Sequence, residues 1–177
     1  MDSRGFVEIH SPKLIAGESE SGAGVFTTDY FGETACLAQS PQLYKQLAVA
    51  GDLGGVYEVG PVFRAENSNT RRHLCEFTGL DFEVPIVSHY SEAISIGHGV
   101  FKAIFEGLES ECGDLLTSVR AQFPSEPAVI SDEPVVLHFD DALQLLRDAG
   151  VAPEDQDDLS GADELRLGNL VKEKHGV

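Results

Sequence analysis

Two strand-like segments joined by a polar loop constrain the fold of this chain more than any other feature. Val56 to Phe63 and Cys75 to Val84 are both rich in residues that favour strands, and residues 66–73 between them are polar. The simplest structure for such a pair is an antiparallel hairpin with a long loop at its tip. The sequence therefore predicts a sheet built around this hairpin.

One face of the second strand carries an unusual set of side chains. Side chains alternate between the two faces of a strand, so Phe77, Asp81 and Glu83 are expected to share one face. Carboxylates are rarely buried in a core unless they are paired. We therefore predict that this face lines a site and does not face a hydrophobic core.

Basic residues concentrate in the same hairpin. Three of the chain's 12 Lys and Arg residues, Arg64, Arg71 and Arg72, lie close together and next to His73. The whole chain has a net charge of −18, which argues against broad electrostatic binding of nucleic acid. A local cluster of guanidinium groups is what an acidic protein needs to hold a triphosphate. Composition alone allows a solvated loop tip equally well.

The segments before the hairpin alternate between strands and loops. Residues 6–10 are expected to form a short strand, and residues 16–24 a loop of small and acidic residues. Residues 25–29 and 34–38 favour strands and flank a turn, so they predict a second hairpin.

A helix is predicted between Ser40, which can cap it, and Gly51, which suits its exit. Gln42 and Lys45 are three positions apart and share a face away from the apolar stripe. The positions expected to form that core-facing stripe recur at helical spacing: Leu43, Leu47 and Ala50.

The second half of the chain is expected to consist of helices separated by acidic segments. Apolar residues at helical spacing predict a long amphipathic helix over residues 93–108 and shorter helices over 140–149 and 163–174. Residues 113–134 are expected to be irregular and acidic, and residues 135–137 to form a short strand.

Hydropathy and cysteine usage indicate a cytoplasmic protein with no membrane contact. No apolar run approaches the roughly 20 residues that a membrane span needs, and the N-terminus has no signal-peptide core. Cys36, Cys75 and Cys112 lie far apart without metal-ligand spacing, so reduced thiols are expected. No metal site is expected within this chain.

The hairpin resembles motif 2 of class II aminoacyl-tRNA synthetases, which reads Phe-Arg-x-Glu, a variable loop, then Arg-His-x-x-Glu-Phe. Residues 63–66 and 72–77 match it position by position, and residues 9–12 resemble motif 1. Residues 38–46 and 18–26 resemble the amino-acid-binding helix and the flipping loop of the aspartyl enzymes of archaeal and eukaryotic cytosolic type. Ser21 stands where that loop commonly has its first glycine.

The resemblance implies an α+β catalytic fold, a mostly antiparallel β-sheet flanked by helices. Residues 1–177 are expected to be part of that catalytic domain, incomplete at both ends. Residues 1–88 are expected to hold motif 1, the flipping loop, the amino-acid helix and motif 2. Residues 89–177 are expected to form a helical and acidic insertion region.

The resemblance also implies a role for each matching residue. Arg64 is expected to be catalytic, contacting the α-phosphate of ATP. Phe77 is expected to stack on adenine. The other expected ATP-binding residues are Glu66, Arg72, His73 and Leu74. The expected aspartate-binding residues are Glu20, Gln42, Lys45 and Asp81. Two residues match positions that touch the tRNA acceptor stem: Ser68 and Thr70.

The implied activity is aspartate–tRNA ligation, with ATP, L-aspartate and tRNA(Asp) as substrates and a homodimer formed through motif 1. Motif 3 is not found, so the ligands of Mg²⁺ are expected beyond Val177. We therefore expect the isolated chain to form no aspartyl-adenylate. The alternatives are an asparagine–tRNA ligase, a class II-like asparagine synthetase, and a non-catalytic truncated paralogue. Lys45 argues against the asparaginyl alternative, because a lysine facing a neutral amide would lose its partner.

Overall fold

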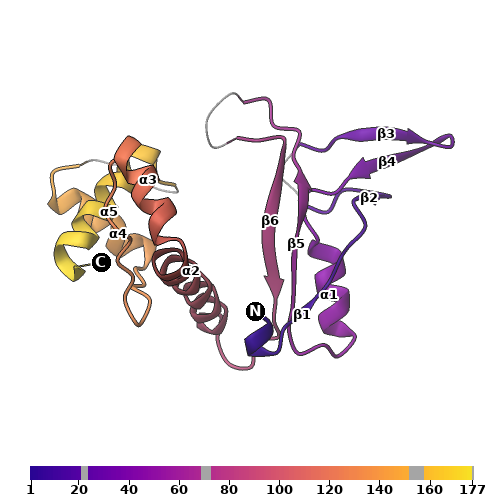
Figure 1. Ribbon diagram of the computed structural model, residues 1–177. Helices are drawn as coiled ribbons and strands as arrows, with labels where there is room; N and C mark the ends of the chain where they lie inside the picture. The colour runs from indigo at the N-terminus through magenta and orange to yellow at the C-terminus, as the bar shows by residue number, and fades with distance from the viewer. Residues whose placement is uncertain (21–23, 69–72, 152–157, 177) are drawn as a thin grey trace. The chain divides into compact units, whose positions relative to one another are not determined.

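A computed structural model describes residues 1–20, 24–68, 73–151 and 158–176. The chain divides into two compact units, Met1–His89 and Tyr90–Val177. All strands of the described residues lie in the first unit, and the described part of the second unit contains helices without strands. Figure 1 shows these elements in chain order.

The predicted hairpin forms the centre of the first unit. β5 (Val56–Phe63) pairs antiparallel with β6 (Glu76–Glu83) along the full length of both strands. β1 (Val7–Glu8) pairs parallel to β5 and completes a sheet in the order β1-β5-β6. η1 (Asp2–Arg4) precedes β1, and the Tyr57 hydroxyl donates a 2.7 Å bond to the Asp2 carboxylate. That bond raises the pKa of Tyr57 to about 12.

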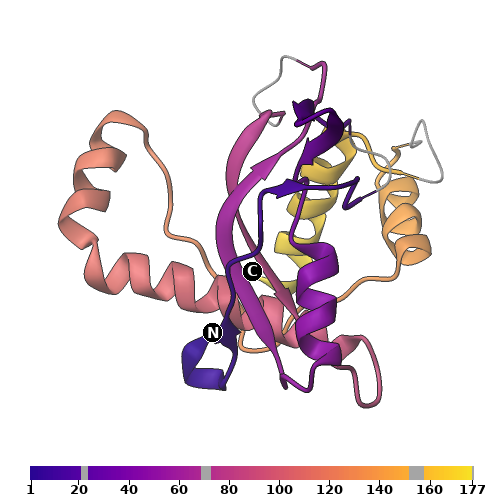
Figure 2. The ribbon, with the colours of Figure 1, turned by 90° about the vertical axis from the view of Figure 1, so that its right-hand side faces the viewer.

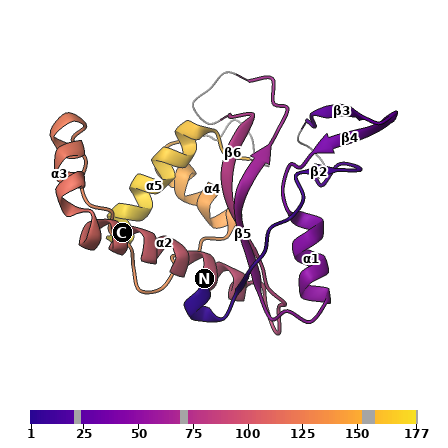
Figure 3. The same cartoon turned by 45° about the vertical axis from the view of Figure 1, so that its right-hand side comes forward.

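The second predicted hairpin is also present. β3 (Thr27–Tyr30) and β4 (Glu33–Leu37) pair antiparallel, and β2 (Leu14–Ile15) pairs with the other edge of β4. Phe31 and Gly32 make the turn with positive φ angles of 53° and 88°, a conformation that favours glycine. Figure 3 shows this smaller sheet beside the upper end of β5.

The helix predicted after Ser40 is α1 (Gln42–Ala50), but its faces are the reverse of the expectation. Leu43 and Leu47 are 51% and 65% exposed, and Ala50 is also exposed, so the predicted core stripe is wrong. Lys45 is the buried residue of this helix, at 8% exposure. α1 packs on β5 and β6, and Lys45 pairs there with the carboxylates of Asp81 and Glu83.

The second unit contains four described helices. α2 (Ser91–Glu111), α4 (Phe139–Asp148) and α5 (Gly161–His175) lie where amphipathic periodicity predicted them. Ser160 caps α5, because its Oγ accepts a 3.2 Å bond from the Asp163 amide. α4 and α5 pack together, and the apolar core described in this unit is on α4: Ala142, Leu143 and Leu146.

Two predictions for this unit are wrong. Residues 113–122, expected to be irregular, form α3 (Gly113–Gln122), which meets α2 at the bend visible in Figure 2. Its acidic Asp114 lies in the first turn and its basic Arg120 in the last, where each charge complements the helix dipole. Residues 135–137 form no strand, because the described part of this unit offers no strand to pair with them.

Candidate active site

One face of the β5–β6 hairpin forms the floor of a trough in the first unit. Three residues of β5 on this face each lie directly opposite one residue of β6. The opposed pairs are Glu58 with Asp81, Gly60 with Gly79, and Val62 with Phe77. A cavity of about 140 Å³ lies over these pairs, and Lys13, Gln39 and Ser40 contribute to its wall.

The two glycines keep the middle of this floor open. A Cβ atom on Gly60 would lie 2.7 Å from Oε1 of Glu58, and a Cβ atom on Gly79 would lie 3.2 Å from Cγ2 of Val62. Larger residues would therefore displace the neighbouring side chains and fill the trough. The opposed glycines leave a flat stretch of backbone between two chemically different ends.

At one end of the trough, Asp81 of the cavity wall pairs with a buried cation, Lys45, that does not itself line the cavity. Nζ of Lys45 donates to Oδ1 of Asp81 and lies 3.4 Å from Oε2 of Glu83. It also lies 3.4 Å from the carbonyl oxygen of Phe82. Asp81 and Glu83 point to the same side of β6, as strand alternation predicted. The Lys45 cluster, which we define as Lys45, Asp81 and Glu83, holds one positive and two negative groups.

At the other end, a guanidinium group lies over an aromatic ring. Cζ of Arg64 is 5.5 Å from the centroid of the Phe77 ring, within the range of a cation–π contact. Nη2 of Arg64 lies 3.5 Å from Oε2 of Glu20. The Arg64 amide donates to the Cys75 carbonyl at 2.9 Å, which extends the hairpin pairing one residue past β5. Arg64 and Phe77 thus form a positively charged, flat surface at the rim.

Other predicted site residues lie near the hairpin tip, outside the cavity wall. Oε2 of Glu66 is 3.8 Å from Nε2 of His73, and Ser68 Oγ is 3.4 Å from His73 Nδ1. Leu74 is exposed.

Gln42 begins α1, where its amide donates a 3.2 Å bond to Ser40 Oγ, and it does not line the cavity. Two predicted residues, Thr70 and Arg72, lie outside the described residues.

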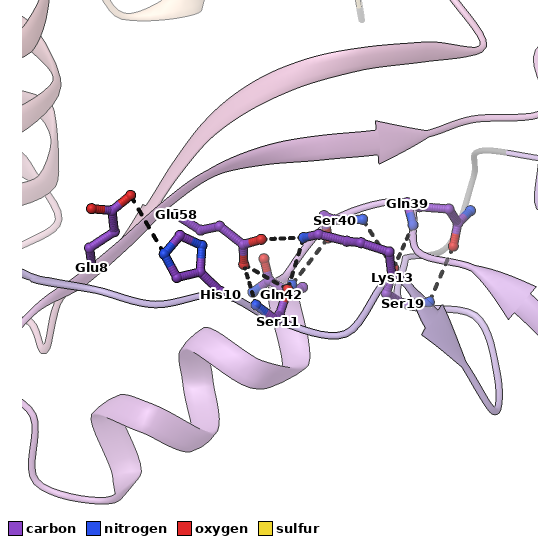
Figure 4. Close-up of polar contacts among 9 residues, drawn as sticks. All are labelled: Glu8, His10, Ser11, Lys13, Ser19, Gln39, Ser40, Gln42 and Glu58. Carbon is purple, nitrogen blue, oxygen red and sulfur yellow. Dashed lines mark hydrogen bonds and ion pairs between the residues drawn. The ribbon is translucent and has the colours of Figure 1, made fainter.

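A buried ion pair at the Lys45 end was not predicted. Glu58 is 3% exposed and accepts bonds from the Ser11 amide (3.1 Å), the Ser11 hydroxyl (2.6 Å) and Nζ of Lys13. Figure 4 shows these groups converging on the Glu58 carboxylate. Burial raises the pKa of Glu58, but the bonds from Lys13 and Ser11 outweigh burial and hold that pKa below its ordinary value.

A signal for this pair was present in the sequence. Glu58 has the same strand parity as Gly60, Val62 and the rim residue Arg64, so it had to face the same side. Lys13 directly follows Pro12 at the end of the segment that resembles motif 1. A single carboxylate inside an otherwise apolar strand indicates a partnered, buried charge.

The described residues carry neither a metal site nor a membrane-spanning helix. No group of three or more His, Cys, Asp and Glu side chains could hold a metal ion there. None of the described helices is both long and apolar enough to cross a membrane. All three cysteines are free, as expected.

The fold and the cavity together define a class: an α+β protein whose antiparallel hairpin presents an arginine–phenylalanine pair, and an aspartate paired with a buried lysine, to one trough. The chain belongs to the family described as tRNA synthetases class II (D, K and N), whose model matches residues 1–175. The predicted membership of the class II aminoacyl-tRNA synthetases and the α+β fold class are thereby confirmed.

Individual relatives point in the same direction. "Aspartate--tRNA ligase 1, cytoplasmic" of Arabidopsis thaliana is 50% identical over 99% of this chain and 33% of the relative. The structure of the aspartyl tRNA synthetase from Entamoeba histolytica matches with a TM-score of 0.81 and 44% identity, over 99% of this chain and 32% of that one. The asparaginyl-tRNA synthetase from Pyrococcus horikoshii, complexed with asparaginyl-adenylate, matches with a TM-score of 0.77 and 30% identity, over 94% and 38%. This chain spans about a third of the length of the curated relatives it matches.

Proposed function

We propose that this chain is the aspartate- and ATP-binding part of an aspartate–tRNA ligase, which activates L-aspartate to aspartyl-adenylate and transfers it to tRNA(Asp). The observation that carries the proposal is the trough itself. At one end of it, Asp81 of the cavity wall pairs with the buried Lys45, and at the other end Arg64 lies over Phe77. Such a trough suits a molecule with an amino acid at one end and a nucleotide at the other.

The Lys45 end suits an amino acid with an acidic side chain. The buried ammonium of Lys45 can pair with the side-chain carboxylate of aspartate, while Asp81 and Glu20 can accept bonds from its α-ammonium group. Gln42, at the start of α1, is proposed to add a neutral polar contact. A neutral amide could not form an ion pair with the Lys45 ammonium as a side-chain carboxylate can, which disfavours asparagine.

The Arg64 end suits the phosphates and the base of ATP. An oxygen of the aspartate α-carboxylate forms a bond to the α-phosphorus, the bond from that phosphorus to the bridging oxygen breaks, and pyrophosphate leaves with the electron pair. Arg64 is proposed to stabilise the negative charge that builds on the α-phosphate, and Phe77 to stack on adenine.

Residues of the hairpin tip are proposed to complete the site. Glu66, Arg72, His73 and Leu74 are assigned to ATP, and Ser68 and Thr70 to the tRNA acceptor end. Mg²⁺, when bound to ATP, would neutralise the outer phosphates. The described residues contain no group of three or more His, Cys, Asp and Glu side chains that could hold it. Assembly as a homodimer through residues 9–12 belongs to the same proposal.

The experiment is ATP–pyrophosphate exchange by the full-length protein that contains this chain, with aspartate and asparagine compared. We expect exchange with aspartate and a rate lower by about 100-fold or more with asparagine, because the neutral amide forms no ion pair with Lys45. Arg64→Ala and Lys45→Ala should each abolish exchange, whereas Arg4→Ala, an exposed control, should not. Exchange with asparagine alone would favour an asparagine–tRNA ligase, since the asparaginyl-tRNA synthetase from Pyrococcus horikoshii shares the fold. A folded protein that binds ATP and exchanges with neither amino acid would favour a non-catalytic paralogue.

A further inference from the structure

Gln39 is a fully buried polar residue in the trough wall that no predicted role explains. Its side chain is 0% exposed, and its Oε1 accepts 3.2 Å bonds from the amides of both Ser19 and Glu20. In return, Oγ of Ser19 accepts 3.2 Å bonds from the amides of Gln39 and Ser40. Figure 4 shows Gln39 and Ser19 facing one another across the two segments.

These four bonds hold together segments that are about twenty residues apart in the sequence. One segment carries Glu20, whose carboxylate lies 3.5 Å from the Arg64 guanidinium. The other leads directly into α1, which carries Lys45. Gly24 is anchored separately, because its carbonyl accepts a 2.8 Å bond from the Ala65 amide. A Cβ atom on Gly24 would lie only 2.4 Å from the Ala65 carbonyl oxygen.

We propose that Gln39 is a positioning residue that fixes the backbone of Glu20, so that the Glu20 carboxylate stays beside the Arg64 guanidinium at the rim of the trough. The proposal rests on the proposed function, in which Glu20 contacts the α-ammonium of aspartate. Two backbone donors on one side-chain oxygen set the position of the Glu20 Cα atom without using the Glu20 carboxylate. That carboxylate remains available to Arg64 before substrate binds and to the ammonium group afterwards.

The role predicts a particular kinetic signature. Gln39→Met keeps the shape of the side chain and removes the acceptor, which leaves two amides without their partner. Because each lost hydrogen bond weakens the held position, the KM for aspartate should rise about 10-fold or more, with the KM for ATP changed less than about 3-fold. Gln39→Glu keeps an acceptor oxygen at the same place and should restore part of the loss. Gln46→Met, at an exposed glutamine on α1, is the control and should change neither constant.

A double-mutant cycle separates positioning from a general structural role. If Gln39 acts through Glu20, then Gln39→Met should raise the KM for aspartate less than about 2-fold when Glu20→Ala is already present. An equal effect in both backgrounds would overturn the proposal, because the residue would then act without Glu20.

Amide hydrogen exchange tests the same role without enzymatic activity. In the full-length protein, Gln39→Met should speed exchange at the Ser19 and Glu20 amides by about 10-fold, and Gln46→Met should not. Unchanged protection of both amides would overturn the role of Gln39. The two proposals can fail separately. If the wild-type protein showed no aspartate-dependent ATP–pyrophosphate exchange but the two amides lost protection in Gln39→Met, the proposed ligase activity would be wrong and the positioning role of Gln39 would stand.

Discussion

The two ends of the trough are built differently. The Lys45 side chain is 10% exposed and held by two carboxylates and a carbonyl oxygen, whereas the Arg64 side chain is 35% exposed and has one carboxylate at 3.5 Å. Bonds at the first end join α1 to β6, and contacts at the second end join a loop to the hairpin rim. The Lys45 end therefore contributes to the stability of the unit, and the Arg64 end is left available for a ligand.

The largest expected effect on stability is at the buried end. Lys45→Met leaves Asp81 and Glu83 facing each other without a cation, and their partial burial makes that arrangement costly. We expect the free energy of unfolding to fall by about 2–4 kcal/mol, measured by urea denaturation. The exposed ion pair of Lys172 with Glu126 provides the control, since Lys172→Met should cost less than about 1 kcal/mol. Equal losses in the two variants would show that burial does not distinguish them.

Arg64 should show the opposite balance between stability and activity. Arg64→Ala removes a half-exposed side chain with one ion pair, so unfolding should change by less than about 1 kcal/mol. If the proposed function holds, aspartate-dependent exchange should fall about 100-fold or more, since the charge on the α-phosphate loses its partner. A loss of stability comparable to that of Lys45→Met would contradict the difference between the two ends.

The buried ion pair below the Lys45 end should make stability depend on pH. The pKa of Glu58 is lower in the folded protein than its ordinary value of 4.5. The stabilisation from its ionised form is therefore present above that value and lost as the pH falls through the folded pKa. Glu58→Gln should cost about 1–3 kcal/mol at neutral pH and lose less stability than the wild type below pH 4.5. Urea midpoints across this range measure both effects, and Glu76→Gln, at an exposed position, serves as the control. Parallel curves for wild type and Glu58→Gln would contradict this role.

The sequence could predict the features set by local pattern or by the family resemblance, and it missed those set by contacts between distant segments. β5, β6 and the longer helices follow from local periodicity, and Arg64, Phe77 and Lys45 were identified through the resemblance to motif 2 and the amino-acid helix. The bonds of Glu58 to Lys13 and of Gln39 to Ser19 join segments 45 and 20 residues apart. Periodicity along one segment carries no information about such partners. Buried polar contacts of this kind shape the trough, and they were missed.

α1 shows why local pattern failed even where the element was correct. Three apolar residues at helical spacing predicted a buried stripe, and the structure instead buries Lys45 on the other side. Packing against β6 places the helix face opposite Asp81 and Glu83, so charge pairing decides which side is covered. A polar site can therefore override hydrophobic patterning where the facing strand carries carboxylates.

The outer face of α1 supplies the smallest expected effect. Leu43→Gln alters a side chain that is already 51% exposed, so the free energy of unfolding should change by less than about 0.5 kcal/mol. Val56→Ala, at a position with 0% exposure, should cost about 1–2 kcal/mol under the same conditions. Both variants are compared by urea denaturation of the 177-residue chain and again of the full-length protein. If Leu43→Gln lowered the free energy of unfolding of the short chain as much as Val56→Ala does, α1 would have to turn its apolar stripe inward. The face that carries Lys45 would then not be the buried one. A large loss confined to the full-length protein would instead show that residues outside this chain cover the stripe, while Lys45 stays buried on the other side.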